Sequence, residues 1–214
     1  MNNSQHEKDH AHESQKTKYF SDMGRDWDSI VGNDKERIRE LAAVIEMIEP
    51  AGGDVVIDVG CGNGVLIPLI EPYIGRRGRI IAVDAAAGMI ETAEKKHGHY
   101  GNIDFRVGLI EDIDIPENHA DLVICFAVFP HIDNQQAALQ RFRKILKPDG
   151  ALYIFHVIDT RSLNEFHGSL DAPVSGDRMP EREQLSRMLE SSSFQMKTYI
   201  DRSGLNFVRA LPEK

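Results

Sequence analysis

Cysteine and clustered cations are both scarce in this chain of 214 residues. Its two cysteines, Cys61 and Cys125, form no Cys-x-x-Cys pair, so a disulfide framework is not indicated and a reducing cytoplasm is expected. The formal net charge is −9, and no basic run is longer than Arg76-Arg77 or Lys95-Lys96. Because binding to a phosphate backbone depends on Lys and Arg, this charge pattern disfavours a nucleic-acid substrate. A small molecule or a protein is the better expectation.

Long apolar runs are absent as well. No stretch approaches the length that spans a bilayer, and the N-terminal residues lack the apolar core of a signal peptide. We therefore expect a cytoplasmic protein without a membrane span. With 41% hydrophobic and 28% charged residues, the composition is that of a soluble globule, and the length suits a single domain. The composition does not choose between a monomer and a homodimer.

The stretch from Val55 to Gly64 is the most informative part of the chain. Val-Val-Ile-Asp-Val predicts a buried strand, and Gly60, Gly62 and Gly64 follow at alternate positions. A helical pattern comes next, with Pro68 in the first turn, where proline is tolerated. Glycine lets a backbone approach a ligand where a side chain would collide, and the N–H groups of the next helix add polar anchors. The pattern predicts a ligand-binding turn at the carboxyl end of a strand.

The spacing of the glycines separates two classes of ligand. Dinucleotide sites favour Gly-x-Gly-x-x-Gly, and here Val65 occupies the place of the third dinucleotide glycine. This chain instead has Gly-x-Gly-x-Gly, with Asp58 two positions before the first glycine. A second acid, Asp84, ends the next predicted strand. A carboxylate there can accept both hydroxyls of an adenosine ribose, and the competing role is a helix N-cap for Ala85-Ala86 onward.

Strands and helices alternate along most of the chain, as in a parallel, doubly wound α/β sheet. Strands are predicted at residues 54–59, 79–84, 103–107, 120–126 and 151–157, and a turn is predicted at 148–150. Helix caps are predicted at Asn33-Asp34 and Asp133. A loop is predicted at 158–179, followed by a helix from Pro180. The closely spaced strands 194–200 and 205–210 must then pair as an antiparallel hairpin.

Three segments resemble the class I S-adenosylmethionine-dependent methyltransferases. The stretch Asp58-x-Gly-x-Gly-x-Gly is similar to the family's motif I, residues 108–121 resemble its Gly-Asp-Ala-x-x-Leu-Pro segment, and residues 146–150 resemble its Leu-Lys-Pro-Gly-Gly turn. Within the class, the chain looks most like the small enzymes related to ubiquinone and menaquinone C-methyltransferases. The resemblance implies a Rossmann-like, mostly parallel seven-stranded sheet of order 3-2-1-4-5-7-6, with strand seven antiparallel.

The resemblance also implies a cofactor and a reaction. S-adenosylmethionine would donate a methyl group to a small-molecule acceptor by in-line displacement, releasing S-adenosylhomocysteine. One departure from the family lies at Leu109, where its adenine-binding acid would fall, so backbone amides at Leu109-Ile110 or the Glu111 carboxylate are expected to read adenine. The expected cofactor contacts are Asp58, Gly60, Cys61, Gly62, Gly64, Asp84, Ala85, Met89, Leu109, Ile110, Glu111 and Phe126.

On the acceptor side, His131 follows the fourth predicted strand and would stand near the transferable methyl group. Histidine is a residue type that often serves as a general base, so His131 is the candidate for that role. The other candidate acceptor contacts are Trp27, Phe129, His156 and His167. For the last two histidines, a local hydrogen bond in a loop is the competing role. The three histidines could instead hold a metal, with Asp171 or Asp177 as an oxygen ligand, although no metal is the expectation.

The expected organisation is one methyltransferase domain at residues 33–214, preceded by a tail and candidate lid segment at 1–32. The cofactor half would span about 33–126 and the acceptor half about 127–214. Within the tail, residues 1–18, with His6, His10 and His12, are expected to be solvated. Two alternatives remain open. An NAD(P)-dependent oxidoreductase would explain Gly60 and Asp84 but not the terminal hairpin, and a protein could bind S-adenosylmethionine without turnover.

Overall fold

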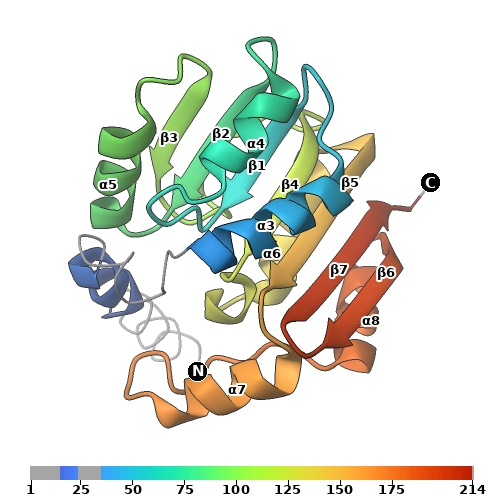
Figure 1. The fold of residues 1–214 in the computed structure, drawn as a ribbon. Helices are drawn as coiled ribbons and strands as arrows, with labels where there is room; N and C mark the ends of the chain where they lie inside the picture. Colours follow the sequence, from blue (N-terminus) through green and yellow to red (C-terminus); the bar gives the residue numbers. More distant parts are fainter. Residues whose placement is uncertain (1–14, 24–34, 214) are drawn as a thin grey trace, which may run out of the picture.

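The computed structural model describes residues 15–23 and 35–213, and its centre is a seven-stranded sheet (Figure 1). The strands lie in the order β3-β2-β1-β4-β5-β7-β6, and β7 runs antiparallel to both of its neighbours. This confirms the predicted α/β class, strand order and terminal hairpin. The strands are β1 (Val55–Val59), β2 (Arg79–Asp84), β3 (Ile103–Val107), β4 (Ala120–Phe126), β5 (Leu146–His156), β6 (Phe194–Arg202) and β7 (Leu205–Pro212).

Helices cover both faces of the sheet. They are α3 (Lys35–Ile48), α4 (Ile67–Ile74), α5 (Ala87–His97), α6 (Gln135–Ile145), α7 (Thr160–Ser169) and α8 (Arg182–Ser191), with a short 3-10 helix, η1 (Phe129–His131). Side chains of α3 and α4 form one apolar core with one face of the sheet, and those of α6 and α8 form a second core with the other. Alternate strand residues enter opposite cores, as Val56 and Ile57 of β1 do. Burial on both faces explains the continuous Val and Ile content of β1 and β2.

The carboxyl ends of β1, β2 and β4 meet at one edge of the sheet, because these strands are parallel neighbours. Val59, Val83 and Cys125 are paired in register there. Three loops leave the sheet at this edge, and the helix of residues 15–23 lies beside them (Figure 1). Ligands bind at this edge in open α/β sheets. The fold therefore brings the glycine turn after β1 close to Asp84, which ends β2.

The predicted loop at 158–179 is wrong in its first half, which forms α7. Asp159 caps this helix, since its side chain accepts hydrogen bonds from the Ser162 backbone N–H at 3.0 Å and from the Ser162 hydroxyl at 2.9 Å. Leu163 and His167, one turn apart, are both buried. The polar composition of the segment concealed a capped helix with one buried face.

Two predicted boundaries between α6 and β5 are also corrected. The cap of α6 is Asn134, whose side chain accepts from the Ala137 N–H at 3.0 Å, and not Asp133. The expected turn at 148–150 lies inside β5, which begins at Leu146. The pairing with β4 changes register across these residues, so they form an irregularity within the strand pair and do not separate two elements.

Residues 1–18 are predicted from the sequence to be solvated. This prediction is wrong for residues 15–18, which belong to the helix of residues 15–23 and are not all solvated. Lys16 of this helix is only 6% exposed. The predicted cap at Asn33-Asp34, the candidate acceptor contact Trp27 and the tail histidines lie outside the described residues. In the described part of the chain, no helix is both long and apolar enough to cross a membrane.

Candidate functional site

The glycine turn after β1 depends on backbone conformations that other residues rarely adopt. Gly60, Gly62 and Gly64 have φ values of 63°, 54° and 85°. A Cβ at Gly60 would lie 2.1 Å from Cγ2 of Val128, in the loop that follows β4. A Cβ at Gly64 would lie 2.6 Å from the Cδ2 atom of His97, at the end of α5. Gly60 therefore lets two loops meet at the sheet edge, whereas Gly64 serves the packing of α5.

Asp84 ties this turn to the loop after β2. Its Oδ2 accepts a hydrogen bond from the Gly62 N–H at 2.9 Å, and its Oδ1 accepts from the Ala86 N–H at 2.8 Å. Burial raises the pKa of Asp84 to about 6, while the hydrogen bonds from Ala86 and Gly62 act in the opposite direction. Of the two roles predicted for this acid, the structure shows local backbone anchoring, and its place in the cavity leaves the ribose role open to test.

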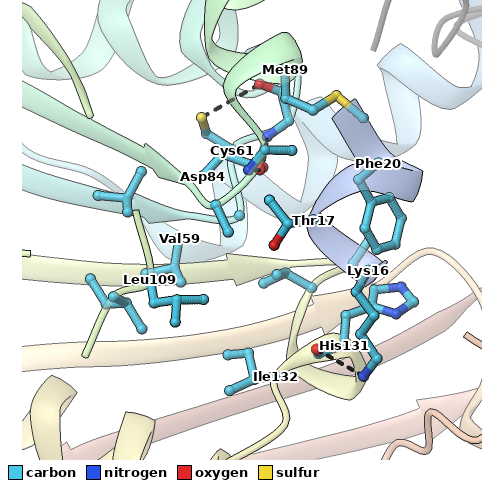
Figure 2. Close-up of a pocket in the computed structure, with 18 of the residues that line it drawn as sticks. Lys16, Thr17, Phe20, Val59, Cys61, Asp84, Met89, Leu109, His131 and Ile132 are labelled. Carbon is cyan, nitrogen blue, oxygen red and sulfur yellow. Dashed lines mark hydrogen bonds between the residues drawn. The ribbon is translucent and has the colours of Figure 1, made fainter. Parts of the chain in front are cut away.

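A cavity opens between these loops, and Figure 2 shows Asp84, Cys61, Met89 and Leu109 around it. All predicted cofactor contacts except Asp58 and Gly64 line this cavity. The sequence prediction missed other lining residues, namely Lys16, Thr17, Phe20, Val59, Asn63, Val65, Val83, Ala86, Gly108, Ala127, Val128, Ile132 and Asp133. Most of these residues are neighbours in sequence of a predicted contact, so a prediction that included the residues on either side of each motif would have found them. Lys16, Thr17 and Phe20 have no such signal.

Asp58 is buried beneath the turn and does not line the cavity. Asp58 is only 1% exposed, and its Oδ2 has no hydrogen-bond partner among the described residues. Burial, together with the nearby charge of Asp84, raises the pKa of Asp58 to about 8. The carboxyl is therefore mostly protonated at neutral pH, and Asp58, although it is one of the expected cofactor residues, lies outside the cavity lining.

The acceptor-side candidates fall in different environments. His131 lines the cavity, and its Nδ1 lies 2.6 Å from Oδ2 of Asp177. Phe129 is wrong as an acceptor contact, because η1 turns its ring into the core, where it is 0% exposed. His156 and His167 are also buried and do not line the cavity. Burial lowers the pKa of His156 to about 3, which keeps this ring neutral.

The metal alternative receives no support. The ring centroids of His131 and His167 are 4.8 Å apart, but within the described ranges no group of three His, Cys, Asp or Glu side chains is arranged to hold an ion. Asp177, an oxygen ligand in that hypothesis, instead pairs with His131 and Lys16.

The helix of residues 15–23 forms one wall of the cavity. Lys16, Thr17 and Phe20 point toward it in Figure 2, and the rings of Phe20 and His131 are 5.0 Å apart in an edge-to-face arrangement. The helix also contacts α5, where the Gly88 N–H donates to the hydroxyl of Ser21 at 3.0 Å. The helix of residues 15–23 thus contacts α5, which follows β2, and η1, which follows β4.

Part of the chain is similar to known proteins. Residues 57–154 match the family model for a methyltransferase domain. The chain is 32% identical over 114 residues to a putative methyltransferase of Invertebrate iridescent virus 6, covering 53% of this chain and 41% of that protein. It is 28% identical over 113 residues to the ubiquinone/menaquinone biosynthesis C-methyltransferase of Hydrogenovibrio crunogenus, covering 51% and 44%. The chain thus spans less than half the length of these two relatives.

A third relative matches over a longer stretch. The ubiquinone biosynthesis O-methyltransferase of Xanthomonas axonopodis pv. citri is 26% identical over 210 residues, covering 94% of this chain and 80% of that protein. Among solved structures, a SAM dependent methyltransferase from Aquifex aeolicus has a TM-score of 0.72 at 19% identity and covers 90% of this chain and 98% of that one. Magnesium protoporphyrin IX methyltransferase from Synechocystis, with bound S-adenosylhomocysteine, has a TM-score of 0.68 at 19% identity, covering 92% and 97%. These structural likenesses confirm the fold.

The fold and the glycine turn thus define a Rossmann-like methyltransferase domain. Residues 57–154 match a methyltransferase domain, as motif I predicts, and relatives that match this part of the chain are methyltransferases, so S-adenosylmethionine is the cofactor to compare with the cavity. The cavity residues fit this group. Gly60 lets the Val128 loop close against the turn, Asp84 offers carboxylate oxygens, and Met89 and Leu109 offer an apolar wall for a flat base.

Cofactor binding is expected to release a proton near neutral pH. The cofactor and its product both carry an α-ammonium group, and a cation beside the turn favours the ionised forms of Asp58 and Asp84. Because burial raises the pKa of Asp58 to about 8, this carboxyl holds a proton at pH 7 in the free protein and loses it when its pKa falls. Titration calorimetry with S-adenosylhomocysteine at pH 7, in buffers of different ionisation enthalpy, measures this release.

The control for this measurement is Asp58→Asn, which keeps the shape of the side chain and cannot titrate. In this variant the binding enthalpy should no longer depend on the buffer. Binding enthalpies of the wild type that are equal in all buffers would contradict the assigned protonation of Asp58.

Proposed function

We propose that this protein transfers a methyl group from S-adenosylmethionine to a small-molecule acceptor by in-line displacement, with release of S-adenosylhomocysteine. One observation carries the proposal. A single cavity is lined by the glycine turn, by the carboxylate of Asp84 and by the ring of His131. The first two suit the cofactor, and the third is a proton acceptor on the side where an acceptor molecule would enter.

The cofactor, when bound, supplies a methyl group already activated by its sulfonium. The protein then has to position two molecules and exclude water. In this proposal Gly60 and Gly62 admit the methionine and ribose parts, and Asp84 accepts the ribose hydroxyls. Met89 and the segment at Leu109 hold the adenine by apolar contact and backbone hydrogen bonds. Asp58 acts from below the turn through its charge.

The acceptor side of the proposal rests on His131 and on the helix of residues 15–23, called the N-terminal helix below. His131 takes the proton of the acceptor as methyl transfer proceeds. Phe20 and Thr17 cover the cavity, which limits water and favours a compact acceptor. The net charge of −9 supports a small molecule over a nucleic acid, and the low cysteine content supports a cytoplasmic setting. Residues 15–23 serve as a lid in this account, with the domain proper at 33–214.

A labelling experiment tests this proposal. The protein is incubated with S-adenosylmethionine carrying a labelled methyl group and with a cell extract separated into small-molecule, protein and nucleic-acid fractions. The proposal predicts label in the small-molecule fraction, dependent on the protein. Label in the protein or nucleic-acid fraction would contradict the acceptor class. Absence of transfer from a protein that binds S-adenosylhomocysteine would favour the alternative of a binding protein without turnover.

A further inference from the structure

Asp177 lies at the centre of a buried charged network beside the cavity. Its Oδ2 is 2.6 Å from His131 Nδ1, and its Oδ1 is 2.6 Å from Lys16 Nζ. Lys16 also pairs with Oδ1 of Asp133 at 2.5 Å, and its ammonium lies 3.4 Å from the backbone oxygen of His131 (Figure 2). Both Lys16 and Asp177 are nearly inaccessible, at 6% and 5% exposure. The two oxygens of Asp177 thus serve separate partners.

Three elements distant in sequence meet in this network, which is defined by Lys16, His131, Asp133 and Asp177. Lys16 comes from the N-terminal helix, His131 from η1, and Asp177 from the segment between α7 and α8. Burying charges is costly unless each one is paired, so a chance arrangement of this kind is unfavourable. The backbone also fixes Asp177, whose N–H donates to the Val174 carbonyl oxygen at 3.1 Å.

The network determines which nitrogen of His131 carries a proton. Burial opposes ionisation of Asp177, but hydrogen bonds from His131 and Lys16 outweigh it and hold the pKa of this carboxyl below its usual value. An ionised carboxylate can only accept hydrogen bonds. At 2.6 Å, Nδ1 of His131 must therefore be the protonated nitrogen. In the neutral ring, Nε2 is then left with a free lone pair.

We propose that Asp177 and Lys16 are positioning residues for His131, and that the acceptor presents an O–H, N–H or S–H group to Nε2 of this ring. This inference rests on the proposed function and specifies its acceptor class. Asp177 fixes the ring orientation and the Nδ1–H tautomer. Lys16 holds Asp177 in place and brings the N-terminal helix, with Phe20, over the same site.

The proton and electrons balance in this step. The acceptor X–H bond breaks and its proton moves to Nε2 of His131. The electron pair left on X forms the new bond to the methyl carbon, and the carbon–sulfur bond breaks with its pair remaining on sulfur. The product is methylated X together with S-adenosylhomocysteine. The imidazolium of His131 then faces the carboxylate of Asp177, which stabilises its positive charge.

Nitrogen NMR of the histidine rings tests the inference without knowledge of the acceptor. In the wild type bound to S-adenosylhomocysteine, neutral His131 should be protonated at Nδ1, and His131→Gln assigns its signal. Asp177→Asn should move the proton toward Nε2, because an amide can donate to Nδ1. Asp171→Asn, an exposed change on the same segment, should leave the tautomer unchanged. A wild-type ring protonated at Nε2, or a tautomer that does not respond to Asp177→Asn, would overturn the inference.

Two further measurements separate this inference from the proposed function. Asp177 does not line the cofactor cavity, so Asp177→Asn should bind S-adenosylhomocysteine within about threefold of the wild type. Its rate of label transfer to the small-molecule fraction should fall about 100-fold, as expected for a misoriented general base. An unchanged rate in a folded, cofactor-binding variant would refute the positioning role. A wild type that binds no S-adenosylhomocysteine would refute the proposed function, whatever the tautomer of His131.

Discussion

Replacing Gly60 with alanine should reduce the affinity for S-adenosylhomocysteine by about 100-fold, equivalent to about 2.7 kcal/mol. The new Cβ would lie 2.1 Å from Cγ2 and 2.5 Å from Cβ of Val128, well inside contact distance. Val128 is β-branched and lines the cavity, so it can make room only if the loop after β4 shifts. That shift deforms the surface on which the cofactor lies. Titration calorimetry on the purified variant measures the loss.

The control for Gly60→Ala must separate backbone strain from the clash. Gly204, in the turn between β6 and β7, has a φ of 79°, and a Cβ there would meet nothing within 4 Å. Gly204→Ala should therefore cost roughly 1 kcal/mol of stability through its positive φ and leave cofactor affinity unchanged. Affinity of Gly60→Ala within threefold of the wild type would show that the turn does not contact the cofactor.

Replacing Asp84 with asparagine should also weaken cofactor binding by about 100-fold. The carboxylate accepts from the N–H groups of Gly62 and Ala86 through different oxygens, and an amide offers one oxygen and one NH₂ group. One backbone donor would then face another donor, and leaving a buried donor unsatisfied costs about 1–3 kcal/mol. Any hydrogen bond to the ribose is weakened as well. Asp149→Asn, an exposed carboxylate on β5, is the matched control and should bind normally.

A modified ligand separates the two roles of Asp84. An analogue of S-adenosylhomocysteine without ribose hydroxyls should bind the wild type more weakly than the natural ligand does. If Asp84 accepts those hydroxyls, Asp84→Asn should weaken binding of the analogue less than it weakens binding of S-adenosylhomocysteine, because only the loss of backbone anchoring then remains. Fully additive losses would assign Asp84 to backbone anchoring alone, which is the N-cap-like alternative considered from the sequence.

The local signals that specify this fold were readable from the sequence because they involve neighbouring residues. The apolar runs predicted as strands at 79–84 and 120–126 coincide with β2 and β4. The terminal hairpin also follows from a short connection between two apolar strands. These features depend on periodicity, glycine and turn length, which a short window contains.

Contacts between distant segments could not be predicted in the same way. Lys16 and Asp133 are 117 residues apart, and His131 and Asp177 are 46 residues apart. Nothing about Lys16 within a polar segment indicates burial, and Phe129 looks like a site residue until η1 turns its ring inward. Asp58 shows a related difficulty. The motif predicts an acid at this position, but only the packing around it shows that burial raises its pKa to about 8.

Titration of the wild-type protein with S-adenosylhomocysteine and, separately, with NADH is the most direct test of the central claim. The account predicts saturable binding of S-adenosylhomocysteine at one site per chain and no detectable binding of NADH, because it assigns the Gly-x-Gly-x-Gly turn, which lacks the dinucleotide spacing, to S-adenosylmethionine. Tight binding of NADH with no response to S-adenosylhomocysteine would contradict it and would favour an oxidoreductase.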